Sequence, residues 1–229
     1  MIELIAISID VPISDKVYED LLNLVSYEKK QRIKRFRFLE DAKRSLFADL
    51  LVRYWMCKNL KLKNSHIKFK TNDYGKPYLD GVENVFFNVS HSAQWIVCGL
   101  SNGEIGVDIE HIKDADLDIA KRFYSQEEYA DLLKKPAAER NKYFFDLWTL
   151  KESYIKYKGK GLYIPLDSFS IKIEDSRVNI LSENLEHPNF QRTMIDDNYM
   201  VAICSDSKEL AKISYVTIEE IWNQVYQSL

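Results

Sequence analysis

The order of apolar and polar residues predicts a chain that passes repeatedly between strands and helices. Residues 2–9 alternate loosely, as the two faces of a strand do. From about 14 to 60 the pattern is helical, with a charged break around 26–44. Within it, apolar residues such as Leu46 and Leu50 recur at steps of three and four, as in a helix that faces a core.

The rest of the chain repeats this succession of strands and helices. Residues 66–79 indicate a strand and a turn closed by Gly75 and Pro77. Further segments are predicted as strands at 85–90, 95–101 and 105–110, then helix over 115–158, then short strands at 168–173, 177–181, 199–205 and 212–218. The strands at 85–90 and 95–101 are expected to join through Ser90-His91-Ser92, and a small helix is expected from Ile218.

A faint internal repeat refines this prediction. Residues 8–11 resemble 106–109, and Ser26-Tyr27-Glu28 resembles Ser125-Gln126-Glu127. We therefore expect an α/β protein of the α+β type, built from two similar subdomains related by a pseudo-twofold axis, with the active site in the cleft between them. The expected division is 1–104 and 105–229.

Composition limits the function classes. Apolar residues make up 46% of the 229, which indicates a packed globular protein. A net charge of −3 argues against general binding to nucleic acid or membranes. The three cysteines are scattered without metal-ligand spacing, and the first apolar run carries an acid and no basic cluster. We expect reduced thiols, no signal peptide, no membrane span and a cytoplasmic protein.

Two acidic side chains stand together on one face of the strand 105–110. Ile105, Val107 and Ile109 occupy one face, so Asp108 and Glu110 share the other and repel unless a positive group lies near. On the helix after residue 148, Glu152 lies on the same stripe as an inward-facing Trp148. Three converging carboxylates are an oxygen-rich site that suits Mg²⁺, and an exposed ion pair from Glu152 to Lys156 is the alternative.

A basic segment predicts a polyanionic ligand. Residues 28–44 have a balance of +5 in a chain of −3, so the other residues together carry −8. Phosphates of a nucleotide, nucleic acid or the acidic face of a protein partner would each fit, with only two or three of the basic side chains touching the ligand. Turns at 75–77, 88–92 and 156–161 add small and basic groups that can contact phosphate.

Five motifs together resemble the Sfp-type 4′-phosphopantetheinyl transferases. The chain carries, in that family's order, "GKPYL", "FNVSHS", "IGVDIE", "FYSQEEY" and "WTLKESYIK". The resemblance runs from about residue 3 to 170, and the chain is about twice as long as the trimeric holo-acyl-carrier-protein synthases. It implies an enzyme that transfers the 4′-phosphopantetheine group of coenzyme A (CoA) to a conserved serine of an apo carrier protein and releases adenosine 3′,5′-bisphosphate.

The resemblance also implies roles for individual residues. Mg²⁺ is expected on Asp108, Glu110 and Glu152, with Glu110 the least secure ligand because the position is not acidic in some relatives. CoA is expected to contact Lys29, Arg32, Ser45, Tyr74, Gly75, Lys76, Pro77, Asn88, Val89, Ser90, His91, Asp108 and Lys156. Residues 1–104 are thus expected to bind the adenosine bisphosphate, and residues 105–229 are expected to hold the metal and the catalytic helix.

The catalytic roles go to Glu152 and Lys156. Glu152 is the expected general base, with a metal-bound water as the alternative, and Lys156 is placed near the pyrophosphate. Lys151 is a weaker candidate for substrate contact. The expected partners are CoA and peptidyl, acyl or aryl carrier proteins, docked at the 158–160 loop or the helix 125–133, and a monomer is expected.

Two other functions remain as alternatives at this stage. A Mg²⁺-dependent phosphohydrolase would use the same carboxylates and would release phosphate without a carrier. A nucleotide- or RNA-binding module without enzymatic activity would use residues 29–44. The negative net charge and the lack of a stacking-aromatic motif count against RNA.

Overall fold

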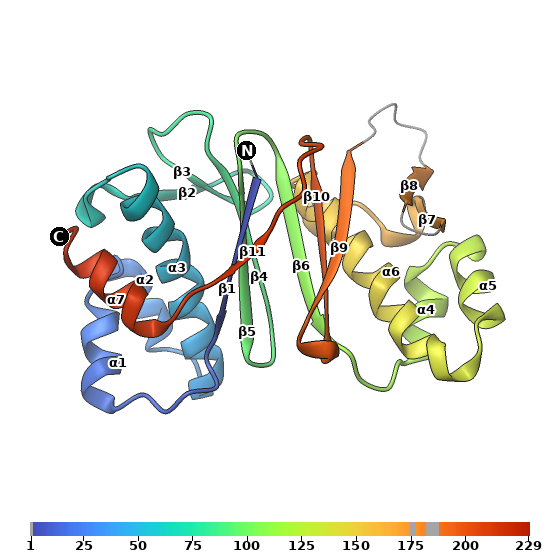
Figure 1. Ribbon diagram of the computed structural model, residues 1–229, viewed down its shortest axis with the longest axis horizontal. Coiled ribbons are helices and arrows are strands. Elements are labelled where there is room, and N and C mark those ends of the chain that lie inside the picture. The colour runs from blue at the N-terminus through green and yellow to red at the C-terminus, as the bar shows by residue number, and fades with distance from the viewer. Residues whose placement is uncertain (1, 175–176, 182–187) are drawn as a thin grey trace.

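The computed structural model describes residues 2–174, 177–181 and 188–229 and is a mixed α/β protein (Figure 1). Its helices are α1 (Asp15–Leu22), α2 (Tyr27–Ile33), α3 (Leu39–Asn59), α4 (Leu117–Phe123), α5 (Gln126–Lys134), α6 (Ala137–Tyr157) and α7 (Ile218–Tyr226). Its strands are β1 (Ile2–Ser8), β2 (Phe69–Thr71), β3 (Pro77–Leu79), β4 (Phe86–Ser92), β5 (Trp95–Ser101), β6 (Ile105–His111), β7 (Ser170–Glu174), β8 (Arg177–Leu181), β9 (Asn189–Ile195), β10 (Tyr199–Ser205) and β11 (Ile213–Tyr215). The predicted fold class is confirmed.

The same order of elements occurs twice along the chain. A strand, two short helices, a long helix, a short hairpin and two more strands run from β1 to β5, and again from β6 to β10. Both long helices, α3 and α6, have 21 residues. The strand orders also correspond, β1-β5-β4 in one sheet and β6-β10-β9 in the other. Ser26 and Ser125, which the sequence repeat paired, each cap the second short helix of their half.

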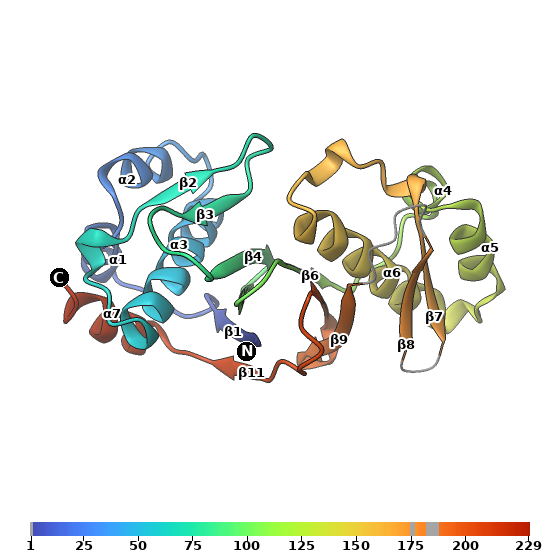
Figure 2. The ribbon, with the colours of Figure 1, turned by 90° about the horizontal axis from the view of Figure 1, so that it is seen from above.

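The C-terminal segment returns to the first half. β11 pairs in parallel with β1, and α7 packs against α3 (Figure 2). The division into 1–104 and 105–229 therefore stays a prediction, with the last elements of the second range lying on the first half. None of the helices in the described part of the chain has the length and apolar character of a membrane span.

Several local predictions need correction. β4 continues through Ser92, so the turn to β5 is formed by residues 93–94 and not by Ser90-His91-Ser92. The predicted helix 115–158 is three helices, interrupted at Ser125 and Pro136, because the serine caps a new helix and the proline precedes one. The strand β9 was not predicted.

The four-stranded and the three-stranded sheet share an apolar core. Residues of β1, β5, β6, β9 and β10 meet in it: Ile2, Leu4, Ala6, Trp95, Val97, Ile105, Val107, Ile109, Ile195, Tyr199, Val201 and Ile203. The opposite face of β1 packs in the core around α3, which explains why this strand is apolar on both faces. Burial of Ile105, Val107 and Ile109 between the sheets leaves Asp108 and Glu110 on the side of β6 that faces α6.

A buried ion pair fixes α6 within the second half. Lys151 is completely buried, and its Nζ lies 2.7 Å from both carboxylate oxygens of Glu128 and from the carbonyl oxygen of Phe169. Glu128 also accepts hydrogen bonds from the backbone N–H groups of Ser125 and Ile171. The pair therefore joins α5, α6 and β7.

Breaking this pair is expected to cost much of the protein's stability. Lys151→Met leaves the Glu128 carboxylate buried without its cation, and we expect a loss of about 3–5 kcal/mol in the free energy of unfolding, measured with urea. Lys134→Met, which removes an exposed pair with Asp131, is the control and should change stability by less than about 1 kcal/mol.

The double variant tests the cause. Adding Glu128→Gln to Lys151→Met should recover part of the loss, because glutamine is uncharged. If Lys151→Met alone lowers the free energy of unfolding by no more than Lys134→Met does, the buried pair does not have the stabilising role assigned to it.

Candidate active site

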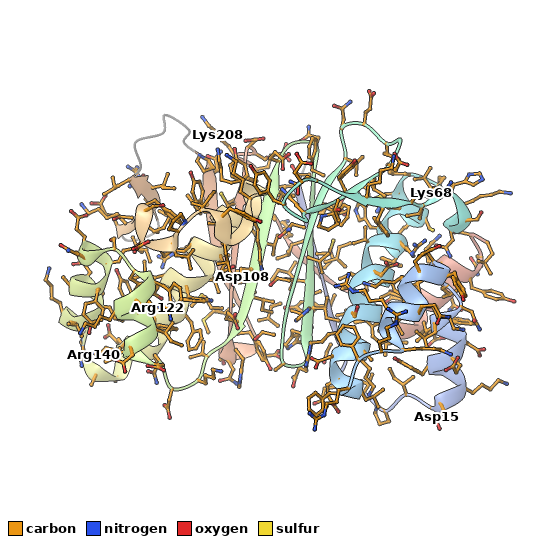
Figure 3. The ribbon with its side chains drawn as sticks, turned by 180° about the vertical axis from the view of Figure 1, so that it is seen from behind. Asp15, Lys68, Asp108, Arg122, Arg140 and Lys208 are labelled. Atoms are coloured by element: carbon orange, nitrogen blue, oxygen red, sulfur yellow. The ribbon has the colours of Figure 1, made fainter. Side chains whose placement is uncertain are left out.

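A close approach between β6 and α6 brings the predicted catalytic residues together. A Cβ atom added to Gly106 would lie 2.0 Å from the carbonyl oxygen of Ser153 and 2.2 Å from the backbone nitrogen of Tyr157, so only glycine allows this contact. On α6, Glu152 directly precedes Ser153 and Lys156 directly precedes Tyr157. On β6, Asp108 lies two residues after Gly106. Figure 3 shows Asp108 near the middle of the molecule, where the two halves meet.

The Asp108 carboxylate is the centre of the cluster. It is 3% exposed, and its Oδ1 accepts hydrogen bonds from Ser90 Oγ at 2.8 Å and from Lys156 Nζ at 2.6 Å. Lys156 Nζ also lies 3.0 Å from Ser90 Oγ. Asp108 Oδ2 is buried and has no hydrogen-bond partner in the described part of the chain. A buried carboxylate oxygen without a partner is costly and indicates a ligand.

Polar residues on one face of β4 hold β6 in register. Asn88 Oδ1 accepts a hydrogen bond from the Val107 N–H at 2.9 Å, and Ser90 Oγ donates to Asp108. Ser92 Oγ donates to Glu110 Oε2 at 2.9 Å and accepts a hydrogen bond from the backbone N–H of His111 at 3.1 Å. The role of Ser92 was missed, although the alternation of Asn88, Ser90 and Ser92 in a predicted strand was a usable signal.

The electrostatics of Glu152 connect it with both carboxylates of β6. Burial, followed by the negative charge of Asp108, raises the pKa of Glu152 to about 7, and Glu110 adds to the rise while Lys156 opposes it. Burial and then Asp108 also raise the pKa of Glu110. The three carboxylates therefore share one electrostatic environment and repel one another.

The carboxylates of Asp108, Glu110 and Glu152 are suited to form part of the coordination shell of a hard divalent cation. In the described part of the chain no three carboxylate, imidazole or thiol side chains are gathered closely enough to enclose a metal by themselves. Mg²⁺ normally binds through one or two carboxylates and completes its octahedron with water and substrate phosphates. The unpartnered oxygen of Asp108 and the mutual repulsion of the acids are what such an ion would relieve.

A cavity of about 1210 Å³ lies in the first half, on the other side of β4. Five of the residues expected to bind CoA line it: Lys29, Arg32, Gly75, Pro77 and Val89. The buried Arg53, held by Asp49 at 2.5 Å and by Asn64, also belongs to the wall. β4, whose Val89 lines the cavity, is an edge strand of its sheet in the described part of the chain.

The other predicted CoA contacts lie outside this cavity. Lys76 Nζ pairs with Glu104 at 2.7 Å and donates to the carbonyl oxygens of Ile105 and Tyr157, so it ties β6 and α6 to the first half. Tyr74 is partly exposed, and its ring contacts Tyr163, with centroids 5.2 Å apart.

The four remaining residues differ in their position. Asn88 and Ser90 belong to the contact with β6, as described above, and Ser45 is half-buried on α3. His91 lies on the exposed edge of β4 and not in a turn. Partial desolvation and then the charge of Arg44 lower the pKa of His91.

One candidate for substrate contact is wrong. Lys151 points into the core of the second half and cannot reach a ligand, because it is fully buried against Glu128 and Phe169. The three cysteines are free and buried, as predicted.

Comparison with known proteins identifies the family. Residues 104–204 match the model of the 4′-phosphopantetheinyl transferase superfamily, and residues 12–102 match that of the 4′-phosphopantetheinyl transferase N-terminal region. The chain is 40% identical to the 4′-phosphopantetheinyl transferase Sfp of Bacillus subtilis, an alignment that covers 94% of this chain and 97% of Sfp. It is 36% identical to the 4′-phosphopantetheinyl transferase gsp of Aneurinibacillus migulanus, covering 96% and 92%. Neither the phosphohydrolase nor the RNA-binding alternative gains support from these relatives.

Two family models that meet between residues 102 and 104, and near full-length similarity to Sfp, agree with the motifs first seen in the sequence. The chain belongs to the Sfp-type 4′-phosphopantetheinyl transferases.

Proposed function

We propose that this protein transfers the 4′-phosphopantetheine group of CoA to a serine of an apo carrier protein. The serine oxygen forms a bond to the β-phosphorus of CoA, the bond from that phosphorus to the bridging oxygen breaks, and adenosine 3′,5′-bisphosphate leaves. The observation that carries the proposal is the arrangement across β4. A basic cavity lies on one side, and Asp108, with its unpartnered oxygen, lies on the other beside Lys156 and Glu152.

The cavity in the first half suits the adenosine bisphosphate end of CoA. Lys29 and Arg32 give it two cations for the phosphates, and Gly75 and Pro77 give it a wall formed by a turn. His91 and Ser45 are proposed to extend this contact toward the edge of β4. Because β4 is an edge strand, the pyrophosphate can cross it and reach Lys156.

Asp108, Glu110 and Glu152 are proposed to contribute carboxylates to a Mg²⁺ shell that water and the substrate phosphates complete. When bound, the ion would neutralise charge on the pyrophosphate and make the phosphorus more open to attack. In the protein itself, Ser90 and Ser92 orient the carboxylates of Asp108 and Glu110, and Lys156 supplies a fixed positive charge beside the reacting phosphate.

Glu152 is proposed as the group that accepts the proton of the attacking serine. A pKa of about 7 matches the requirements of a general base near neutral pH. A water molecule at the site is the alternative acceptor. The protein is proposed to work in the cytoplasm. It is proposed to act as a monomer, because one chain contains both the cavity and the acidic cluster.

The direct test measures the product on the carrier. The protein is incubated with CoA, Mg²⁺ and several apo peptidyl, acyl and aryl carrier proteins, and each carrier is weighed by mass spectrometry. We expect an adduct of one phosphopantetheine on at least one carrier. Phosphate release from CoA without any adduct would favour a phosphohydrolase instead.

Removing charge from the acidic cluster is expected to abolish transfer without unfolding the protein. Asp108→Asn and Glu152→Gln should each lower kcat by a factor on the order of 10²–10³, since each removes a charge placed for the transition state. The control is Glu139→Gln, an exposed acid on the same helix α6, which should leave kcat unchanged. Activity of Asp108→Asn within a few-fold of the unmodified protein would contradict the assignment.

The nucleotide cavity can be tested separately. Arg32→Ala should raise KM for CoA by roughly 10–100-fold, the equivalent of a charge-assisted hydrogen bond, and should leave KM for the carrier unchanged. Lys34→Ala is the matched control, because this lysine sits just beyond α2 but pairs with Glu19 at 3.6 Å and does not line the cavity. Equal effects of the two variants would count against this binding site.

Metal binding should be linked to pH through Glu152. A carboxyl group with a pKa of about 7 is largely protonated below pH 7 and must lose that proton to ligate Mg²⁺. We therefore expect Mg²⁺ binding to release protons and to weaken as the pH falls below 7, as measured by calorimetry in buffers of different ionisation enthalpy. Glu152→Gln should release fewer protons, and the same proton count in both proteins would oppose Glu152 as a ligand.

A further inference from the structure

Most of the basic segment lies outside the nucleotide cavity. Of its eight cations, only Lys29 and Arg32 line that cavity. Lys30 lies within ion-pair distance of Glu19, and Arg44 pairs with Asp41 at 2.5 Å. The turn between α2 and α3 thus holds basic residues, Arg35 and Arg37 among them, whose position the proposed CoA site does not explain.

This turn combines cations with exposed apolar side chains. We call the set of Arg35, Phe36, Arg37, Phe38 and Leu39 the α2–α3 patch. Phe36, Phe38 and Leu39 are 39%, 56% and 53% exposed. Arg37 lies over the Phe38 ring, 5.2 Å from its centroid. Within the described residues, neither arginine of the patch forms an ion pair.

Such a composition is typical of a protein-binding surface. Contiguous exposed aromatic and aliphatic side chains are uncommon on a surface that only meets water, and they mark interaction sites. Aromatic residues and arginine are also the types enriched at the energetic centres of interfaces. Two unpaired arginines among apolar groups favour a partner whose apolar contact face carries carboxylates.

The patch is connected to the acidic cluster through the start of α3 and the turn after β4. Leu39 begins α3, and Arg44 follows after a rise of about 7.5 Å along the helix. Arg44 donates to the carbonyl oxygen of Ala93 at 3.2 Å, in the turn that directly follows Ser92 and its hydrogen bond to Glu110. No residue of the patch lines the nucleotide cavity, so a partner can bind here while CoA occupies its site.

We propose that the α2–α3 patch docks the carrier protein through an acidic helix with an apolar face. Arg35 and Arg37 would pair with its carboxylates, and Phe36, Phe38 and Leu39 would contact the apolar residues near the acceptor serine. This inference rests on the proposed function, which requires a protein serine to reach the cluster. It differs from the docking sites expected from the sequence, the 158–160 loop and the helix 125–133.

The test compares two double variants in a steady-state transfer assay with an acidic apo carrier. Phe36→Ser with Phe38→Ser, and Arg35→Glu with Arg37→Glu, should each raise KM for the carrier at least about tenfold. KM for CoA should stay unchanged in both. The effect of the charge reversal should shrink at high salt, because exposed charges are screened.

Matched controls alter residues of the same kind elsewhere. Tyr226→Ser removes an aromatic ring that is 53% exposed on α7, and Lys208→Glu with Lys212→Glu reverses two exposed cations near the C-terminal end of the chain. Both controls should leave KM for the carrier unchanged. Thermal melting of all variants verifies that they fold, which is expected because every substituted side chain of the patch is exposed.

The outcomes separate the inference from the function on which it rests. If the unmodified protein loads no carrier, the proposed function fails. If loading occurs and both patch variants keep the KM of the unmodified protein, the docking surface is overturned while the function stands. Loss of binding to a fluorescent RNA oligonucleotide, with KM for the carrier unaffected, would also overturn the inference and assign the patch to nucleic acid.

Discussion

The arrangement of the site depends on one buried carboxylate, Asp108, and on the contacts that hold it in place. Burying an isolated carboxylate costs several kcal/mol, unless a cation and hydrogen-bond donors replace the lost water. Here Ser90 comes from β4 and Lys156 from α6, so the charge can be stabilised only when three elements from both halves are packed together. The contact at Gly106 makes this packing possible. One oxygen of Asp108 is still left for a ligand.

β4 connects the two parts of the site because its two faces have different partners. Asn88, Ser90 and Ser92 face β6 and hold its acidic residues, whereas Val89 faces the cavity. In the described part of the chain β4 is also an edge strand of its sheet. This arrangement is the basis for proposing that the nucleotide of CoA binds in the cavity and its diphosphate at the acidic cluster.

The sequence predicted what local patterns encode. Alternation along 105–110 correctly separated the apolar face of β6 from Asp108, and the serines at 26 and 125 marked two corresponding helix starts. It could not predict which polar side chains face another element, because that depends on packing between segments far apart in the chain. Lys151 was a candidate for substrate contact, yet it is buried in a core. Lys76 forms hydrogen bonds that tie the two halves together, and its contact with CoA stays a prediction.

The proposed reaction requires a fixed geometry between the two halves. The cavity and the α2–α3 patch belong to the first half, whereas Asp108, Glu152 and Lys156 belong to the second. In the proposed in-line displacement, a shift of these groups by about an ångström would slow the reaction on the order of a hundredfold. The core shared by β1, β5, β6 and β10 resists such a shift, because separating the sheets would expose its apolar side chains to water. The geometry therefore favours a preformed site over one assembled by closure of two loosely joined halves.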